Sequence, residues 1–254
     1  MTATSTPNGV RTVKSASRTI ELLEYLASRQ ANPPHLAEVC TALGAPRSSV
    51  YALLRTLVQQ GWVQSDGTDG YSLGIRVLIA GTSYIDSDPY VRIVRPILVD
   101  LSTTFGETFH MGRIDGDKVV YLFTQESHRE LRAYSRVGRR MPATATALGK
   151  VILAHRPELI PETFERLTEF SITNRVDFDA DVATTLERGY STEDQENTLG
   201  VRCIAFPLPY SQPVTDAISC SIPKVRWTEA NVERITEGMR AAAIRIVESA
   251  PVSV

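Results

Sequence analysis

Residues 47–60 combine cationic and hydroxyl side chains with a regular apolar pattern. One helical face is apolar and consists of Val50, Leu53, Leu54, Leu57 and Val58. The other face carries Arg47, Ser48, Ser49, Tyr51, Ala52, Arg55 and Gln59. Arginine can bind phosphates or guanine edges, and the free N–H groups and serine hydroxyls at a helix N-terminus favour an anion. The pattern predicts a helix that contacts the major groove of double-stranded DNA, with an ordinary surface helix as the alternative.

The elements on either side of this segment favour the DNA interpretation. A helix is expected from Ser15, with an apolar face at Ala16, Ile20, Leu23 and Ala27. A short helix with Leu36, Val39 and Cys40 follows, and Gly44 suits the tight turn before residue 47. The runs 62–64 and 71–73 flank an Asp-Gly turn and predict a β-hairpin. This order is typical of a winged helix-turn-helix domain, predicted over residues 14–73 after a disordered arm at residues 1–13.

Length and charge predict a second, different domain. The chain has 254 residues and a net charge of −2, divided as +2 in residues 1–85 and −4 in the remainder. A small basic module on a larger acidic body fits a DNA-contacting head joined to a domain with another partner. Residues 74–89 are predicted to be a linker helix that ends at Asp86-Ser87-Asp88-Pro89, and residues 90–250 to form the second domain.

The pattern of residues 90–250 predicts the α+β class with an antiparallel sheet. Strands are expected at 107–113, 118–124, 131–137, 201–207 and 214–222. Helices are expected at 91–105, 144–154, 161–170 and 179–188, and a last one carries Val232, Ile235, Met239, Ala242 and Ile246 on one face.

Several classes of function are disfavoured by what the sequence lacks. It contains no GxSxG, Walker loop, GxGxxG or HExxH motif, and its four histidines lack zinc-ligand spacing. We therefore expect no catalytic residues, no metal and no cofactor. No run is long and apolar enough for a membrane helix, and there is no apolar signal core. Three dispersed cysteines suit a reducing compartment, so we expect a cytoplasmic protein with no membrane partner.

Motifs along nearly the whole chain resemble the IclR family of bacterial transcriptional regulators. They lie at residues 15–23, 47–57, 106–108, 142–154, 188–190 and 199–207, in the family's order. The stretch Pro142–Ala154, with Ala, Thr and Gly-Lys, is the most distinctive. One position departs from the family, because Ala52 stands where relatives often place an arginine after Tyr51. Arg55, one turn later, is expected to supply that contact.

The resemblance implies a GAF-like effector-binding domain joined by the linker helix to the winged helix-turn-helix. The implied effector-contacting positions are Ala133, Met141, Ala147, Leu148, Glu193, Val201, Cys203, Ser219 and Ser221. The implied DNA-contacting positions are Arg18, Arg47, Ser48, Ser49, Tyr51, Ala52 and Arg55. We expect a homodimer or homotetramer that binds a near-palindromic operator, with affinity tuned by an organic acid or aromatic effector. Two alternatives stay open: a metabolite-converting enzyme with a GAF-like body, and a DNA-binding protein without a ligand.

Individual residues qualify this view of the effector site. Strand alternation places Ser219 and Ser221 on one face, where small hydroxyl side chains leave room for a ligand. Glu193 would repel an acidic effector unless a proton or cation intervened, so it is expected to accept from a hydroxyl or amine. The cationic candidates are Arg132 and Arg136, which are more simply explained as a solvated strand edge. Lys150 is expected to fix the structure or a subunit contact, whereas backbone N–H groups at 145–150 suit a carboxylate.

Overall fold

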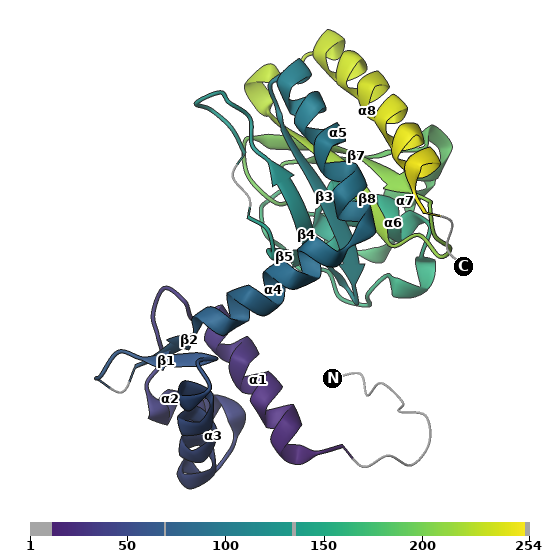
Figure 1. The fold of residues 1–254 in the computed structure, drawn as a ribbon. Helices are drawn as coiled ribbons and strands as arrows, with labels where there is room; N and C mark the ends of the chain where they lie inside the picture. The colour runs from purple at the N-terminus through teal and green to yellow at the C-terminus, as the bar shows by residue number, and fades with distance from the viewer. Residues whose placement is uncertain (1–11, 69, 134–135, 252–254) are drawn as a thin grey trace. The chain divides into compact units, whose positions relative to one another are not determined.

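The structure is a computed structural model that describes residues 12–68, 70–133 and 136–251 (Figure 1). It divides into two compact units, Met1–Tyr84 and Ile85–Val254. The predicted disordered arm lies outside the described residues, apart from residues 12 and 13. Within the described ranges, no helix has the length and apolarity needed to span a bilayer.

The N-terminal unit folds as three helices and a two-stranded hairpin. Its elements are α1 (Lys14–Ser28), α2 (Leu36–Leu43), α3 (Arg47–Gln59), β1 (Val63–Ser65) and β2 (Tyr71–Leu73). Antiparallel pairing of β1 with β2 makes the wing, and a bridge between His35 and Gly70 extends it. The core includes Leu26 of α1, Val39 of α2 and Leu54 of α3. The winged helix-turn-helix prediction is therefore confirmed.

The apolar face predicted for α1 is wrong except at Leu23, which is partly buried against the core. Ile20 is 58% exposed and Ala27 is also exposed, whereas Leu22 and Leu26 are buried against α2, α3 and the wing. Both stripes have helical spacing, and only the contacts with the neighbouring elements select between them. The helix begins at Lys14, one residue before the expected start at Ser15.

A long helix, α4 (Ile75–Ser87), leaves the N-terminal unit and is followed almost at once by α5 (Pro89–Phe105). Asp88 alone separates them. Its carboxylate accepts hydrogen bonds from the backbone N–H groups of Tyr90 and Val91, which satisfies the first turn of α5. The expected end of the linker helix at residues 86–89 thus consists of a single capping residue, Asp88.

The C-terminal unit is built on a curved antiparallel sheet with the order β5-β4-β3-β8-β7-β6 in the described residues. The strands are β3 (Thr108–Asp115), β4 (Lys118–Gln125), β5 (Arg140–Pro142), β6 (Ser191–Asp194), β7 (Val201–Leu208) and β8 (Asp216–Pro223). The helices α5 and α8 (Glu229–Ser249) cover one face through an apolar cluster that includes Phe109 and Ile218. The helices α6 (Ala147–Ala154) and α7 (Arg175–Arg188) cover part of the other. The predicted α+β fold with an antiparallel sheet is confirmed.

Two element predictions in this unit are wrong, and two short strands, β5 and β6, were not predicted. The described part of 131–137 is not a strand, because a turn at Arg136–Gly138 precedes the real edge strand β5. Residues 161–170 are not helical, since the Ser171 hydroxyl accepts from the N–H groups of Leu167 and Thr168, which an α-helix would use internally. The strand β6 was missed because its four polar residues show no apolar alternation.

Candidate functional site

Helix α3 offers an exposed polar face whose N-terminus is free of acidic groups. Its N-cap is Pro46, which has no side chain to accept from the helix N–H groups. Gly44, at φ +54°, makes the turn from α2 into α3. Val50 and Leu54 are fully buried, and this orients the opposite face outward. An uncapped helix N-terminus with nearby cations is a favourable site for a phosphate.

The predicted DNA-contacting residues are placed as follows. Arg47, Ser48, Tyr51, Ala52 and Arg55 are exposed, Ser49 on the same helix is half-buried, and Arg18 on α1 is half-buried. Within the described part of the chain, neither Arg47 nor Arg55 has an ion pair or side-chain hydrogen bond. Both guanidinium groups are therefore available to an external anion.

The C-terminal unit contains a cavity of about 870 Å³. It lies on the same face of the sheet as α6 and α7, over the part of that face that the two helices do not cover. Its sheet residues are His110, Tyr121, Glu193, Val201, Cys203, Ser221 and Pro223. Its remaining walls are residues 131–133, Arg139, the segment Asn197–Gly200 and the turn at 224–225. The lining combines apolar surface with a few polar groups, which is the usual composition of a small-molecule site.

A hydrogen-bonded chain runs across the strands that line this cavity. His110 Nδ1 lies 3.0 Å from Thr124 Oγ1, and its Nε2 lies 3.1 Å from Ser221 Oγ. Ser221 Oγ also lies 3.3 Å from Cys203 Sγ. Burial, with a smaller contribution from the charge of Arg139, lowers the pKa of His110 to about 3. The imidazole is therefore neutral at physiological pH, and the chain carries no net charge.

Glu193 is the buried carboxyl group of the cavity. Its side chain is 2% exposed, and Oε1 accepts from the backbone N–H of Asn197 at 3.0 Å. Burial raises the pKa of Glu193 to about 7, and the Asn197 hydrogen bond only partly opposes this. A large fraction of Glu193 is thus protonated near neutrality and can donate as well as accept. This resolves the repulsion expected between Glu193 and an acidic ligand.

The predicted effector residues divide into two groups. Those that line the cavity are Ala133, Glu193, Val201, Cys203 and Ser221. Those outside its lining are Met141, Ala147, Leu148 and Ser219. The first three of these belong to the apolar cluster around α6. The start of α6 is capped internally, because Thr146 Oγ1 accepts from Gly149 N–H at 3.0 Å.

Several cavity residues were missed by sequence reasoning. They are His110, Tyr121, Arg139, Lys224 and the segment Asn197–Gly200. A signal existed for His110, since it alternates with Phe109 and Met111, which point into the core under α5 and α8. The cationic candidates also change, because Arg132 lines the cavity and Arg136 does not.

Ion pairs fix the walls of the cavity from outside. Lys150 of α6 is fully buried, and its Nζ lies 2.5 Å from Glu196 Oε1 and 3.4 Å from Asp181 Oδ2. Glu196 directly precedes the wall segment Asn197–Gly200. Burial raises the pKa of Glu196, and the charge of Lys150 opposes the rise. Lys150 thereby ties this wall to α6.

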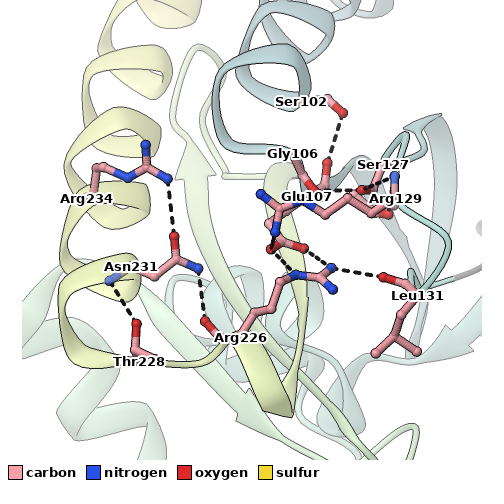
Figure 2. Close-up of polar contacts among 11 residues, drawn as sticks. Ser102, Gly106, Glu107, Ser127, Arg129, Leu131, Arg226, Thr228, Asn231 and Arg234 are labelled. Atoms are coloured by element: carbon pink, nitrogen blue, oxygen red, sulfur yellow. Dashed lines mark hydrogen bonds and ion pairs between the residues drawn. The ribbon is translucent and has the colours of Figure 1, made fainter.

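A second brace holds the rim near residues 131 and 225 (Figure 2). Glu107 is fully buried and accepts from Arg226 Nε and Nη2, each at 2.6 Å. The same Nη2 donates to the backbone oxygen of Leu131 at 3.0 Å. Because Leu131 and Val225 line the cavity, this bidentate pair sets the distance between two parts of its rim.

Comparison with known proteins identifies both units. The model for the IclR helix-turn-helix domain matches residues 15–67, and the one for the bacterial transcriptional regulator IclR C-terminal region matches residues 82–248. The chain belongs to the IclR family. The transcriptional repressor IclR of Escherichia coli is 32% identical over 246 residues, covering 92% of this chain and 88% of that protein. The regulator XynR of the same organism is 29% identical over 242 residues, covering 92% and 96%.

Solved structures give the same fold for this IclR-family regulator. The crystal structure of an IclR transcriptional regulator from Alicyclobacillus acidocaldarius superposes with a TM-score of 0.81 at 22% identity, covering 94% of this chain and 99% of that one. The curated relatives are named as transcriptional regulators, and the family match places this chain among transcriptional regulators with a helix-turn-helix domain. In the described residues, no group of three or more His, Cys, Asp or Glu side chains is arranged to hold a metal ion.

Proposed function

We propose that this IclR-family regulator binds a near-palindromic operator through α3, and that a small-molecule effector in the C-terminal cavity changes its operator affinity. The observation that carries this proposal is the cavity of about 870 Å³, which is lined by the uncharged hydrogen-bonded chain of His110, Ser221 and Cys203. The other unit of the same chain is a helix-turn-helix. Two sites on separate units of one chain are the requirement for linkage, in which each ligand changes the affinity for the other.

The DNA contacts are assigned by exposure and charge. Arg47 and the N–H groups at the start of α3 bind a phosphate, together with Ser48 and Ser49. Arg55, exposed one turn beyond Ala52, reaches a base edge or a second phosphate and supplies the arginine that position 52 lacks. Tyr51, 50% exposed, lies against a sugar or a thymine methyl group.

The effector is an organic acid or an aromatic compound. The cavity wall includes Arg132, Arg139 and Lys224 against the single carboxyl group of Glu193, so its charge favours an anion. An IclR homologue from Microbacterium hydrocarbonoxydans has been crystallised in complex with 4-hydroxybenzoate. 4-Hydroxybenzoate is both an organic acid and an aromatic compound, so it is a suitable first probe.

The working form is a homodimer or a homotetramer. Helix α4 has no buried residue, and Ile75, Leu78 and Ile79, which share one helical face, are each more than half exposed. An exposed apolar stripe of this kind marks a protein contact, and a second copy of α4 supplies a matching surface. Two copies then present two α3 helices to the two halves of a near-palindrome.

The test separates coupling from binding. In the wild type, 4-hydroxybenzoate and other acids are titrated into the protein bound to its upstream intergenic DNA, and operator affinity is followed by fluorescence anisotropy. We expect at least one acid to change that affinity. Because α4 is helical through Ser87, a flexible Gly-Ser insertion after Asp86 should leave both separate affinities intact and abolish the change. An insertion variant that keeps the full response, or a wild type with no affinity for its own upstream DNA at low salt, would contradict the proposal.

A further inference from the structure

Arg139 lines the cavity and is half-buried, and no described carboxylate pairs with it. Arg188, the other half-buried cation of the described C-terminal unit without a carboxylate partner, instead donates to Tyr190 O and Thr192 Oγ1 and does not line the cavity. The one side-chain hydrogen bond of Arg139 to a described residue runs from Nε to Met141 Sδ, at 3.0 Å. A thioether sulfur is a weak acceptor and compensates little of the cost of removing a cation from water.

The backbone places this side chain firmly. The carbonyl oxygen of Arg139 accepts from Tyr121 N–H at 3.0 Å, and its own N–H donates to the Arg136 oxygen at 3.1 Å. Its charge acts on two residues that line the cavity: it contributes to lowering the pKa of His110, and it opposes the rise in the pKa of Tyr121. Arg139 thus lies close enough to influence His110 and Tyr121, and both of its terminal nitrogens are unused by the described residues.

The other cations of the cavity do not fit the same role. Arg132 Nε already donates to Glu126 Oε2 at 3.0 Å, and Lys224 is exposed at the rim. The start of α6 is also unsuited, because Ala147 and Leu148 lie in an apolar cluster outside the cavity lining. Arginine presents two parallel N–H donors that match a carboxylate, which makes Arg139 the best-placed anion anchor in the cavity.

We propose that Arg139 binds the carboxylate of the effector, and that the uncharged chain of His110 and Ser221 hydrogen-bonds a hydroxyl group of the same molecule. The effector class is then a hydroxylated monocarboxylate. This inference rests on the proposed function for its biological meaning, but the binding it describes is independent of DNA. It identifies Arg139 as a specificity-determining residue that the family resemblance does not supply.

The test uses pairs of molecules in which an uncharged amide of nearly the same shape replaces the carboxylate. Equilibrium dialysis measures the binding of 4-hydroxybenzoate against 4-hydroxybenzamide, lactate against lactamide, and gluconate against gluconamide. We expect the wild type to prefer the acid by at least about tenfold in one or more pairs. Arg139→Met should reduce that ratio to near one, and Arg139→Lys should retain part of it. Arg132→Met is the matched control and should keep the preference.

Three results of the dialysis experiment would overturn the inference. A wild type that prefers no acid over its amide excludes the carboxylate anchor, and a preference that persists in Arg139→Met assigns it elsewhere. If Arg139→Met and Arg132→Met lost the preference for the acid equally, the preference would come from the overall charge of the cavity and not from Arg139.

Two further measurements separate this role from a structural one. Without ligand, Arg139→Met should unfold at the same temperature as the wild type or higher, because it removes an unpaired, partly desolvated cation. It should also bind upstream DNA like the wild type. If the DNA measurement fails for the wild type itself, the proposed function falls, while dialysis still decides the role of Arg139.

Discussion

Two regions of the C-terminal unit bury charge in opposite ways. At the start of α5, Arg113 lies between Asp88 and Asp216, with Nη1 2.5 Å from Asp88 Oδ2 and Nη2 2.6 Å from Asp216 Oδ2. Tyr210 donates to the same Asp216 and stacks on Tyr90 of α5. In the cavity, Arg139 has no carboxylate partner among the described residues. The first arrangement is complete without a ligand, and the second leaves donors that a ligand can use.

The buried carboxyl groups repeat this difference. Asp216 is fully buried and receives both Nε and Nη2 of Arg113. Glu193 is almost as buried, but among the described residues its hydrogen bond comes from the Asn197 N–H and no cation pairs with it, and burial raises its pKa to about 7. A buried acid that pairs with a cation can hold structure together, whereas burial without such a partner favours the protonated form. Internal pairing therefore separates the structural charges of this fold from those that await a ligand.

The largest expected effect comes from breaking the paired region. Arg113→Met leaves Asp88 and Asp216 without their cation, and an uncompensated buried charge costs about 3–5 kcal/mol. We expect the free energy of unfolding of the C-terminal unit to fall by that amount in urea titrations. The control is Arg175→Met, which removes the pair with Asp179, whose two side chains are both more than half exposed.

The control should change stability by less than about 0.5 kcal/mol, since exposed helical pairs contribute little. If Arg113→Met were no more destabilising than Arg175→Met, the paired cluster would not be a structural element, and the contrast with the cavity would fail.

The second prediction removes the titrating group of the cavity. Glu193 has its pKa raised from 4.5 to about 7, so the folded state holds its proton more tightly than the unfolded state. Its contribution to stability is fully present below about pH 4.5 and is lost as the pH rises through 7. Glu193→Gln should therefore unfold like the wild type at about pH 4.5 and be more stable at about pH 8, by an amount on the order of 2–3 kcal/mol.

Urea titrations at these two pH values measure the difference. The matched control is Glu162→Gln, an exposed glutamate that should show no such pH-dependent gain. A Glu193→Gln variant that is less stable than the wild type at high pH would mean that the carboxylate is charged and paired, contrary to its lack of a cationic partner.

Local sequence patterns predicted the buried and exposed faces of α3 better than they predicted the lining of the cavity, for a physical reason. In α3, the apolar stripe and the polar face are set by residues within four positions of each other, so Val50 and Arg55 could be assigned from spacing alone. The cavity joins residues from five strands and three loops, and Arg139 enters it from a turn before a three-residue strand. No periodicity marks such a position.

Long-range contacts also decided what local signals left ambiguous. Lys150 lies in a distinctive motif, but its partner Glu196 is 46 residues away and follows a strand with no apolar alternation. For α1, helical spacing allowed two stripes, and the packing of Leu22 and Leu26 chose between them. The family resemblance supplied five of the cavity residues because it carries tertiary information that one sequence lacks.

The smallest expected effect extends the comparison to the surface of α3. Arg47 and Arg55 resemble Arg139 in lacking an acidic partner among the described residues, but they are exposed, so leaving them unpaired costs little stability. Arg55→Ala should weaken operator binding by about 1–3 kcal/mol if the guanidinium contacts a base, and Arg47→Ala should lower the salt dependence of binding by about one phosphate contact. Fluorescence anisotropy across a salt series measures both. Stability and the binding of organic acids should stay within about 0.5 kcal/mol of the wild type, as for Arg175→Ala on α7. An unpaired arginine on α3 whose loss changes folding but not DNA affinity would break the rule that unpaired charge marks a binding surface.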